Sequence, residues 1–98
     1  MTANIVIPED EIADFCRKHH ILKLSLFGSV LRDDFGPNSD VDVLVEYEPG
    51  AIVTLIDMAQ QEIELSELID RKVDLRTAEE LSRYFRQQVV QTAERIYE

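Results

Sequence analysis

The stretch LFGSVLRDDFGPNSDVDVLVE, residues 26–46, carries the pattern that decides the fold of this 98-residue chain. It opens at the end of an apolar run over residues 21–27, whose alternation predicts a strand. Gly28-Ser29 follows, and a short helical turn over residues 30–34 leads into a segment rich in turn-forming residues. The stretch ends in DVDVLVEY, residues 40–47, the most β-like run in the chain. The sequence therefore predicts two strands joined through a glycine–serine turn.

The sequence on either side adds further elements to these two strands. The spacing of apolar residues predicts helices over residues 8–20 and 52–69, a third strand over 72–76, and helices over 78–84 and 85–97. This order predicts a two-layer α+β fold, in which helices pack on a small mixed sheet of about three strands. The length predicts a single domain that spans residues 1–98.

The predicted elements carry apolar faces that we expect to form the core. In the first strand and the last helix, these faces consist of Leu22, Leu24 and Leu26, and of Phe85, Val89, Ala93 and Ile96. The helix over 52–69 has an apolar stripe wider than a surface helix needs, which includes Ile52, Leu55, Ile56, Ala59 and Ile63. We expect this stripe to pack in the core, and a docking face for a partner is the alternative.

The charge balance and composition restrict the classes of function. The chain has 20 acidic and 10 basic side chains, and its formal net charge of −10 disfavours direct binding of nucleic acid. The same balance favours a basic protein partner, or carboxylates that hold cations. The single cysteine, Cys16, excludes an internal disulfide and a cysteine-rich metal site. The sequence shows no signal-peptide pattern and no apolar run near the roughly 18 residues of a membrane span, so we expect a cytoplasmic protein without membrane contact.

Three aspartates are candidates for a metal site. Asp40 and Asp42 are spaced by two on the second predicted strand, so their side chains lie on the same face. Asp74 lies between two apolar residues of the third strand, in the same local setting as Asp42. If the two strands are neighbours, three carboxylates converge into a hard-oxygen site that suits Mg²⁺. The alternative places Asp40 in a turn, Asp42 on a solvated edge, and Asp74 in a surface ion pair with Lys72 or Arg76.

Gly28-Ser29 is a candidate phosphate site. Glycine permits a tight turn and a close approach of the backbone, and serine caps a helix or bonds a phosphate oxygen. Arg32 follows three residues later, about one helical turn along, within reach of the same phosphate. For an isolated Gly-Ser pair, a simple helix cap is the alternative.

The order of these pieces resembles the signature of the DNA polymerase β-like nucleotidyltransferase superfamily. The resemblance is greatest to its minimal branch, the MNT proteins often encoded beside HEPN toxins. It rests on Leu26-Phe27-Gly28-Ser29, on the run from Asn38 to Glu46, and on Lys72-Val73-Asp74-Leu75 as the strand of the third carboxylate. The chain departs from many relatives after the serine, where Val30-Leu31 takes the place of a basic residue.

The resemblance implies roles for these residues. Asp40 and Asp42 would ligate two Mg²⁺ ions, and Asp74 would complete the metal site and accept the proton of the attacking hydroxyl. Gly28 and Ser29 would hold the terminal phosphates of ATP, with a less secure part for Arg32. The implied reaction transfers AMP from ATP to a hydroxyl, expected to be that of a tyrosine, on a partner HEPN toxin. The chain would then be an antitoxin that forms a hetero-oligomer with its toxin.

Two other functions remain open at this point. The chain is alternatively a binding-only antitoxin, which neutralises its toxin by forming a complex and keeps a vestigial nucleotide site. The exposed acidic surface would then match a basic partner. A metal-dependent phosphohydrolase or a nucleotide-sensing module is a third possibility, which the motif spacing fits less well.

Overall fold

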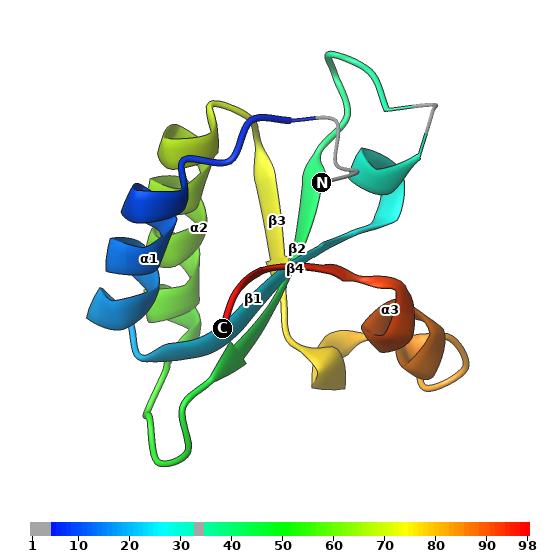
Figure 1. Cartoon of the computed structure of the whole chain (residues 1–98). Helices are drawn as coiled ribbons and strands as arrows, with labels where there is room; N and C mark the ends of the chain where they lie inside the picture. The colour runs from blue at the N-terminus through cyan, green and yellow to red at the C-terminus, as the bar shows by residue number, and fades with distance from the viewer. Residues whose placement is uncertain (1–4, 33–34) are drawn as a thin grey trace.

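Four strands form one mixed sheet in the order β3-β2-β1-β4 (Figure 1). The structure is a computed structural model that describes residues 5–32 and 35–98. The strands are β1 (Ile21–Phe27), β2 (Val41–Tyr47), β3 (Val73–Arg76) and β4 (Glu94–Tyr97). β1 pairs antiparallel with both β2 and β4, whereas β2 pairs parallel with β3. The two-layer α+β expectation is confirmed, with one strand more than the sequence predicts.

Two helices, α1 (Glu9–Lys18) and α2 (Leu55–Ile69), cover one face of the sheet (Figure 1). Acidic residues in the first turn of α1 and basic residues in its last turn complement the helix dipole. Thr54 and Asp57 form a capping box at the start of α2. Parallel strands need a crossover connection, and α2 supplies it between β2 and β3.

The hydrophobic core lies between these two helices and the sheet. It takes alternate residues from the strands, because successive strand side chains point to opposite faces. Its members are Ile12, Phe15, Cys16, Ile21, Leu24, Leu26, Val30, Val41, Val43, Val45, Leu65, Ile69, Val73 and Leu75. Every residue of β2 and β3 between these core positions therefore faces away from α1 and α2.

Three shorter helical segments lie outside the layer formed by α1 and α2. They are η1 (Gly28–Leu31), η2 (Ala78–Glu80) and α3 (Arg86–Thr92), and Figure 1 shows η1 and α3 on the side opposite α1 and α2. The helical turn predicted for residues 30–34 lies earlier in the structure: η1 begins at Gly28 and ends at Leu31, and Arg32 is extended. Residues 33–34 lie outside the described part of the chain. None of the helices among the described residues is long and apolar enough to cross a membrane.

The last predicted helix is wrong in its second half. The helix ends at Thr92, and residues 94–97 form β4 at the edge of the sheet beside β1. Ile96 does pack against the core, but it does so from a strand, and Phe85 is 46% exposed. Residues 94–97 form a strand because they pair with β1, about 70 residues earlier in the sequence. Local periodicity cannot predict such long-range pairing.

Two expectations about the core are also wrong. Leu22 is exposed, because the register between β1 and β2 shifts between Ile21 and Lys23 and turns Leu22 outward. The helix begins at Leu55, three residues later than predicted, and its apolar stripe faces solvent, with exposed fractions of 85%, 71% and 62% for Leu55, Ile56 and Ile63. Ile52 precedes the helix and is 92% exposed. The helix instead buries Gln61, Leu65 and Ile69.

Candidate active site

Asp42 and Asp74 lie side by side on neighbouring strands. The parallel register of β2 and β3 pairs these two residues directly. Their flanking residues are buried on the side of α1 and α2, so both aspartates point toward the opposite face. Asp40 immediately precedes β2 and is exposed. The structure thus meets the condition on which the metal-site prediction depends, namely that the two strands are neighbours.

The carboxylates interact electrostatically. The pKa of Asp42 is raised above its ordinary value, first by burial and then by the negative charges of Asp74 and Asp40. Arg76 and Arg32 act in the opposite direction and lower it. A cation close to Asp42 would therefore relieve both the repulsion among the carboxylates and the cost of burial.

Gly28 makes the close approach between the turn and the carboxylates possible. Its φ of +75° lies in the left-handed region, which glycine tolerates best. A Cβ at this position would lie 3.2 Å from Cγ of Asp42 and closer still to Oδ2. The backbone of the Gly28-Ser29 turn therefore lies against the Asp42 carboxylate, because Phe27 at the end of β1 pairs with Asp42.

Ser29 and Arg32 lie next to this contact. Ser29 is half-buried in η1, and its carbonyl accepts a hydrogen bond from the backbone N–H of Arg32 at 2.9 Å. Arg32 is exposed and is close enough to Asp42 to lower its pKa. The structure thus brings together all three predicted nucleotide-binding residues at the end of β1, on the side where Asp42 is found.

Arg76 forms an ion pair with Asp74. Its Nε donates to Oδ1 of Asp74 at 3.0 Å, and a terminal nitrogen donates to Oδ2 at 3.3 Å. Within residues 5–32 and 35–98, no three acidic, histidine or cysteine side chains are grouped so as to hold a metal ion. The oxygen donors of the three aspartates suit Mg²⁺ in kind. To serve as a ligand, Asp74 must exchange its guanidinium partner for the ion, and the side chain of Arg76 is 46% exposed to solvent.

The site has a neighbour that sequence reasoning did not find. A groove of about 440 Å³ separates the Gly28 turn from α3, and Phe85 and Gln88 contribute to its wall. The sequence predicts that Phe85 lies in the core, because its spacing from Val89 and Ala93 is that of one helical face. A polar glutamine one turn from an aromatic residue was the only available signal, and such a signal is weak by itself.

Comparison with known proteins identifies the family. The family model of the polymerase beta nucleotidyltransferases matches residues 10–98. A protein of Methanocaldococcus jannaschii that is named a protein adenylyltransferase is 37% identical over 60 residues, which are 61% of this chain. The match spans 62% of the length of that relative, somewhat less than two thirds.

Solved structures agree with this comparison. A protein described as a minimal nucleotidyltransferase superposes with a TM-score of 0.70 and 32% identity, over 87% of this chain and 85% of that chain. A toxin–antitoxin structure with AMP-PNP gives a TM-score of 0.72 and 25% identity, over 93% of this chain and 73% of that chain. The chain belongs to the polymerase beta nucleotidyltransferase family.

Proposed function

We propose that this chain is a Mg²⁺-dependent nucleotidyltransferase that transfers AMP from ATP to a tyrosine hydroxyl of a partner HEPN toxin and thereby acts as its antitoxin. The observation that carries the proposal is the contact of the Asp42 carboxylate with the backbone of Gly28, beside Asp74. In this arrangement the turn proposed to bind phosphate lies close to two of the carboxylates proposed as metal ligands. Phosphoryl transfer needs both within reach of the same nucleotide.

The residues have distinct roles in this proposal. Asp40, Asp42 and Asp74 would hold two Mg²⁺ ions, which when bound lower the pKa of the acceptor hydroxyl and neutralise the departing pyrophosphate. The Gly28 backbone and the Ser29 hydroxyl would hold the terminal phosphates. Arg32 would add a positive charge at the same place. The chain thus positions the triphosphate and stabilises charge.

The transfer step balances as follows. The tyrosine oxygen attacks the α-phosphorus, the bond from that phosphorus to the bridging oxygen breaks, and pyrophosphate leaves. Asp74 accepts the proton of the attacking hydroxyl. The product is a tyrosine–AMP phosphodiester on the partner, and a bulky anionic group of this kind would block a neighbouring site of the partner by charge and size.

The names of the relatives support a protein acceptor and a toxin partner. One relative is named a protein adenylyltransferase, and a structural neighbour of 25% identity is described as a toxin–antitoxin structure with AMP-PNP. The motifs resemble those of MNT proteins encoded beside HEPN toxins. The net charge of −10 adds an argument for a basic protein partner.

The decisive experiment measures the intact mass of the partner toxin. The toxin is incubated with this chain, ATP and Mg²⁺, and we expect its mass to rise by one or more AMP units. The variant Asp40→Asn/Asp42→Asn should abolish the gain, because amides are poor Mg²⁺ ligands compared with carboxylates. A toxin whose mass stays unchanged while it co-purifies with the wild-type chain would refute the catalytic proposal.

A binding-only antitoxin is the second candidate, and the outer face of α2 favours it. Leu55, Ile56 and Ile63 expose most of their surface, and so does Ile52 just before the helix. Large exposed apolar patches on soluble proteins often mark interaction sites. Host protection by Asp40→Asn/Asp42→Asn separates the two functions, because a binder keeps protection and an enzyme loses it.

A further inference from the structure

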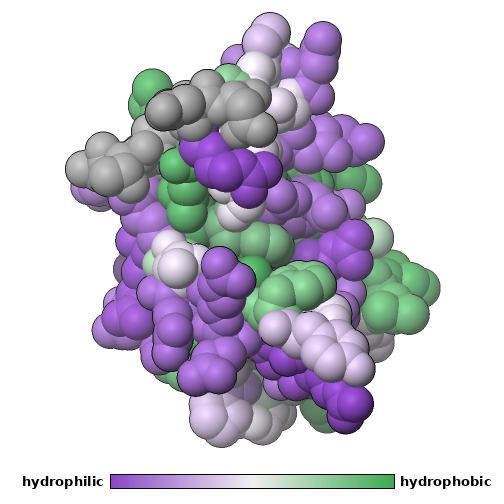
Figure 2. Space-filling view, turned by 90° about the vertical axis from the view of Figure 1, so that its right-hand side faces the viewer, coloured by the Kyte–Doolittle hydropathy of each residue, from purple (hydrophilic) through white to green (hydrophobic). Residues whose placement is uncertain are grey.

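The groove between η1 and α3 adjoins the turn to which the proposed function assigns the phosphates. Gly28 and Arg32 form one wall, and Phe85, Gln88 and Val89 from the start and middle of α3 form the other. Figure 2 looks onto this side of the molecule and shows a hydrophobic area at its centre with hydrophilic side chains around it. Gly28 therefore both lines the groove and contacts the Asp42 carboxylate.

The chemistry of the groove suits a flat aromatic ring with polar edges. Phe85 is 46% exposed, and Phe27 and Leu31 add apolar surface on the side of the turn. The side chain of Gln88 has no hydrogen-bond partner among the described residues, so its donors and acceptor are available. An aromatic platform beside a free amide is a combination that proteins use to hold nucleobases by stacking and by hydrogen bonds to the base edge.

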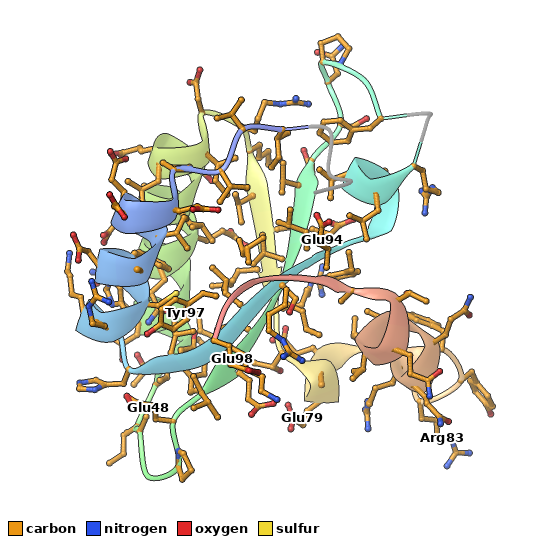
Figure 3. All side chains as sticks on the ribbon, viewed as in Figure 1. Glu48, Glu79, Arg83, Glu94, Tyr97 and Glu98 are labelled. Atoms are coloured by element: carbon orange, nitrogen blue, oxygen red, sulfur yellow. The ribbon has the colours of Figure 1, made fainter. Side chains whose placement is uncertain are left out.

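The size and place of the groove agree with this occupant. Its volume of about 440 Å³ lies within the range of small-molecule sites. A smaller cavity of about 160 Å³ lies farther along the strands, where it is lined by Leu44, Glu46 and Glu79 and does not touch Gly28 or Arg32. Figure 3 shows Glu79 on η2, away from the turn. A nucleotide with its phosphates at Gly28 reaches the larger groove and meets no carboxylate among the residues that line it.

We propose that the groove between Gly28 and α3 is the nucleobase pocket, with Phe85 as stacking platform and Gln88 as the residue that bonds the base edge. The inference rests on the proposed function, since that function places the triphosphate at the Gly28 turn. It adds a second half to the binding site, which is supplied by α3.

The test compares two ligands, ATP and inorganic triphosphate, each with Mg²⁺, by isothermal titration calorimetry. Neighbouring residues of the same chemistry provide matched controls. Gln87 precedes Gln88 in α3 and does not line the groove. Tyr84 precedes Phe85 and contacts Arg83, whose guanidinium lies 5.4 Å from the ring centroid and extends away from the sheet (Figure 3).

We expect Phe85→Ala and Gln88→Ala each to weaken ATP binding about tenfold, the loss typical of a base contact. Inorganic triphosphate should bind these variants as it binds the wild type, because it has no base. Gln87→Ala and Tyr84→Ala should leave both affinities unchanged. Equal ATP affinity in all four variants would overturn the pocket while leaving the proposed function intact. A wild-type chain that binds neither ligand would overturn the proposed function, and this inference with it.

Discussion

Substitution of Gly28 by alanine tests the contact on which the site depends. The change has two costs, and the first is backbone strain, because a residue with a Cβ at a φ of +75° loses about 1–2 kcal/mol. The second is the collision of the new Cβ with the Asp42 carboxylate, since Cγ lies 3.2 Å from that position. Overpacking of this kind costs typically 1–3 kcal/mol. We therefore expect Gly28→Ala to lower the free energy of unfolding by about 2–5 kcal/mol.

The other two glycines separate these costs. Gly50 has a φ of +86° with nothing within 4 Å of its Cβ position, so Gly50→Ala should cost only the backbone strain. Gly36 has no positive φ and no heavy atom within 4 Å of its Cβ position, so Gly36→Ala should cost almost nothing. Urea unfolding followed by circular dichroism in metal-free buffer gives the free energies. For a domain of this size, each 1 kcal/mol also shifts the melting temperature by about 4–8 °C.

A double variant isolates the collision. In Asp42→Ala the carboxylate is absent, and the remaining Cβ lies at an ordinary 3.5 Å from the position of the added group. Gly28→Ala should then cost no more in the Asp42→Ala background than Gly50→Ala costs in the wild type. If Gly28→Ala is no more destabilising than Gly50→Ala, or if removal of the carboxylate gives no relief, the contact with Gly28 does not hold the Asp42 carboxylate in place.

Three further predictions concern the charges and the outer surface. The raised pKa of Asp42 means that this carboxyl binds its proton more tightly in the folded state, so protonated Asp42 contributes stability that is lost as pH rises from about 4 through the folded pKa. Asp42→Asn should remove this loss in urea unfolding at a series of pH values. An unchanged pH dependence in the variant would contradict the prediction. Arg76→Gln should strengthen Mn²⁺ binding several-fold, as measured by electron paramagnetic resonance, because Asp74 loses a competing partner; weaker binding would show that the pair does not compete with the ion. Ile56→Asp and Ile63→Asp should leave the melting temperature nearly unchanged, since both residues are exposed, but should abolish co-purification with the partner toxin; retained co-purification would exclude this face of α2 as the docking surface.

The elements that the sequence predicts well have strong local patterns. The strand predicted for residues 21–27 matches β1, and those for 40–47 and 72–76 differ from β2 and β3 by one residue at the start. In each case an apolar alternation is bounded by turn-forming or charged residues. The features that the sequence misses depend on tertiary contacts instead. β4 is four residues long, and pairing with the distant β1 makes it a strand.

The orientation of α2 shows a second limit of local patterns. Two faces of the helix are apolar, and the wider one contains Ile56 and Ile63. Periodicity therefore predicts burial of the face that the structure exposes to solvent. The sheet is contacted by the face that includes Gln61, a residue that looks unsuited to a core. Its amide oxygen accepts a hydrogen bond of 2.6 Å from the hydroxyl of Tyr47, which removes the cost of its burial. A long-range partner of this kind leaves no trace in the periodicity of either segment.

The same reasoning applies to the charges of the site. The sequence predicts that Asp42 and Asp74 meet on one face only if their strands are neighbours, and it leaves open whether Asp74 binds a metal or forms an ion pair with Lys72 or Arg76. In the structure, Arg76 is paired with the same Asp74 carboxylate that would bind a metal, and this carboxylate lies beside Asp42. The ion pair and the metal would therefore compete for Asp74. Closely spaced carboxylates need a positive charge in every state in which they are ionised. Arg76 supplies that charge in the structure described here, and under the proposed function a divalent cation takes its place, so the cost of displacing Arg76 contributes to the metal affinity of the site.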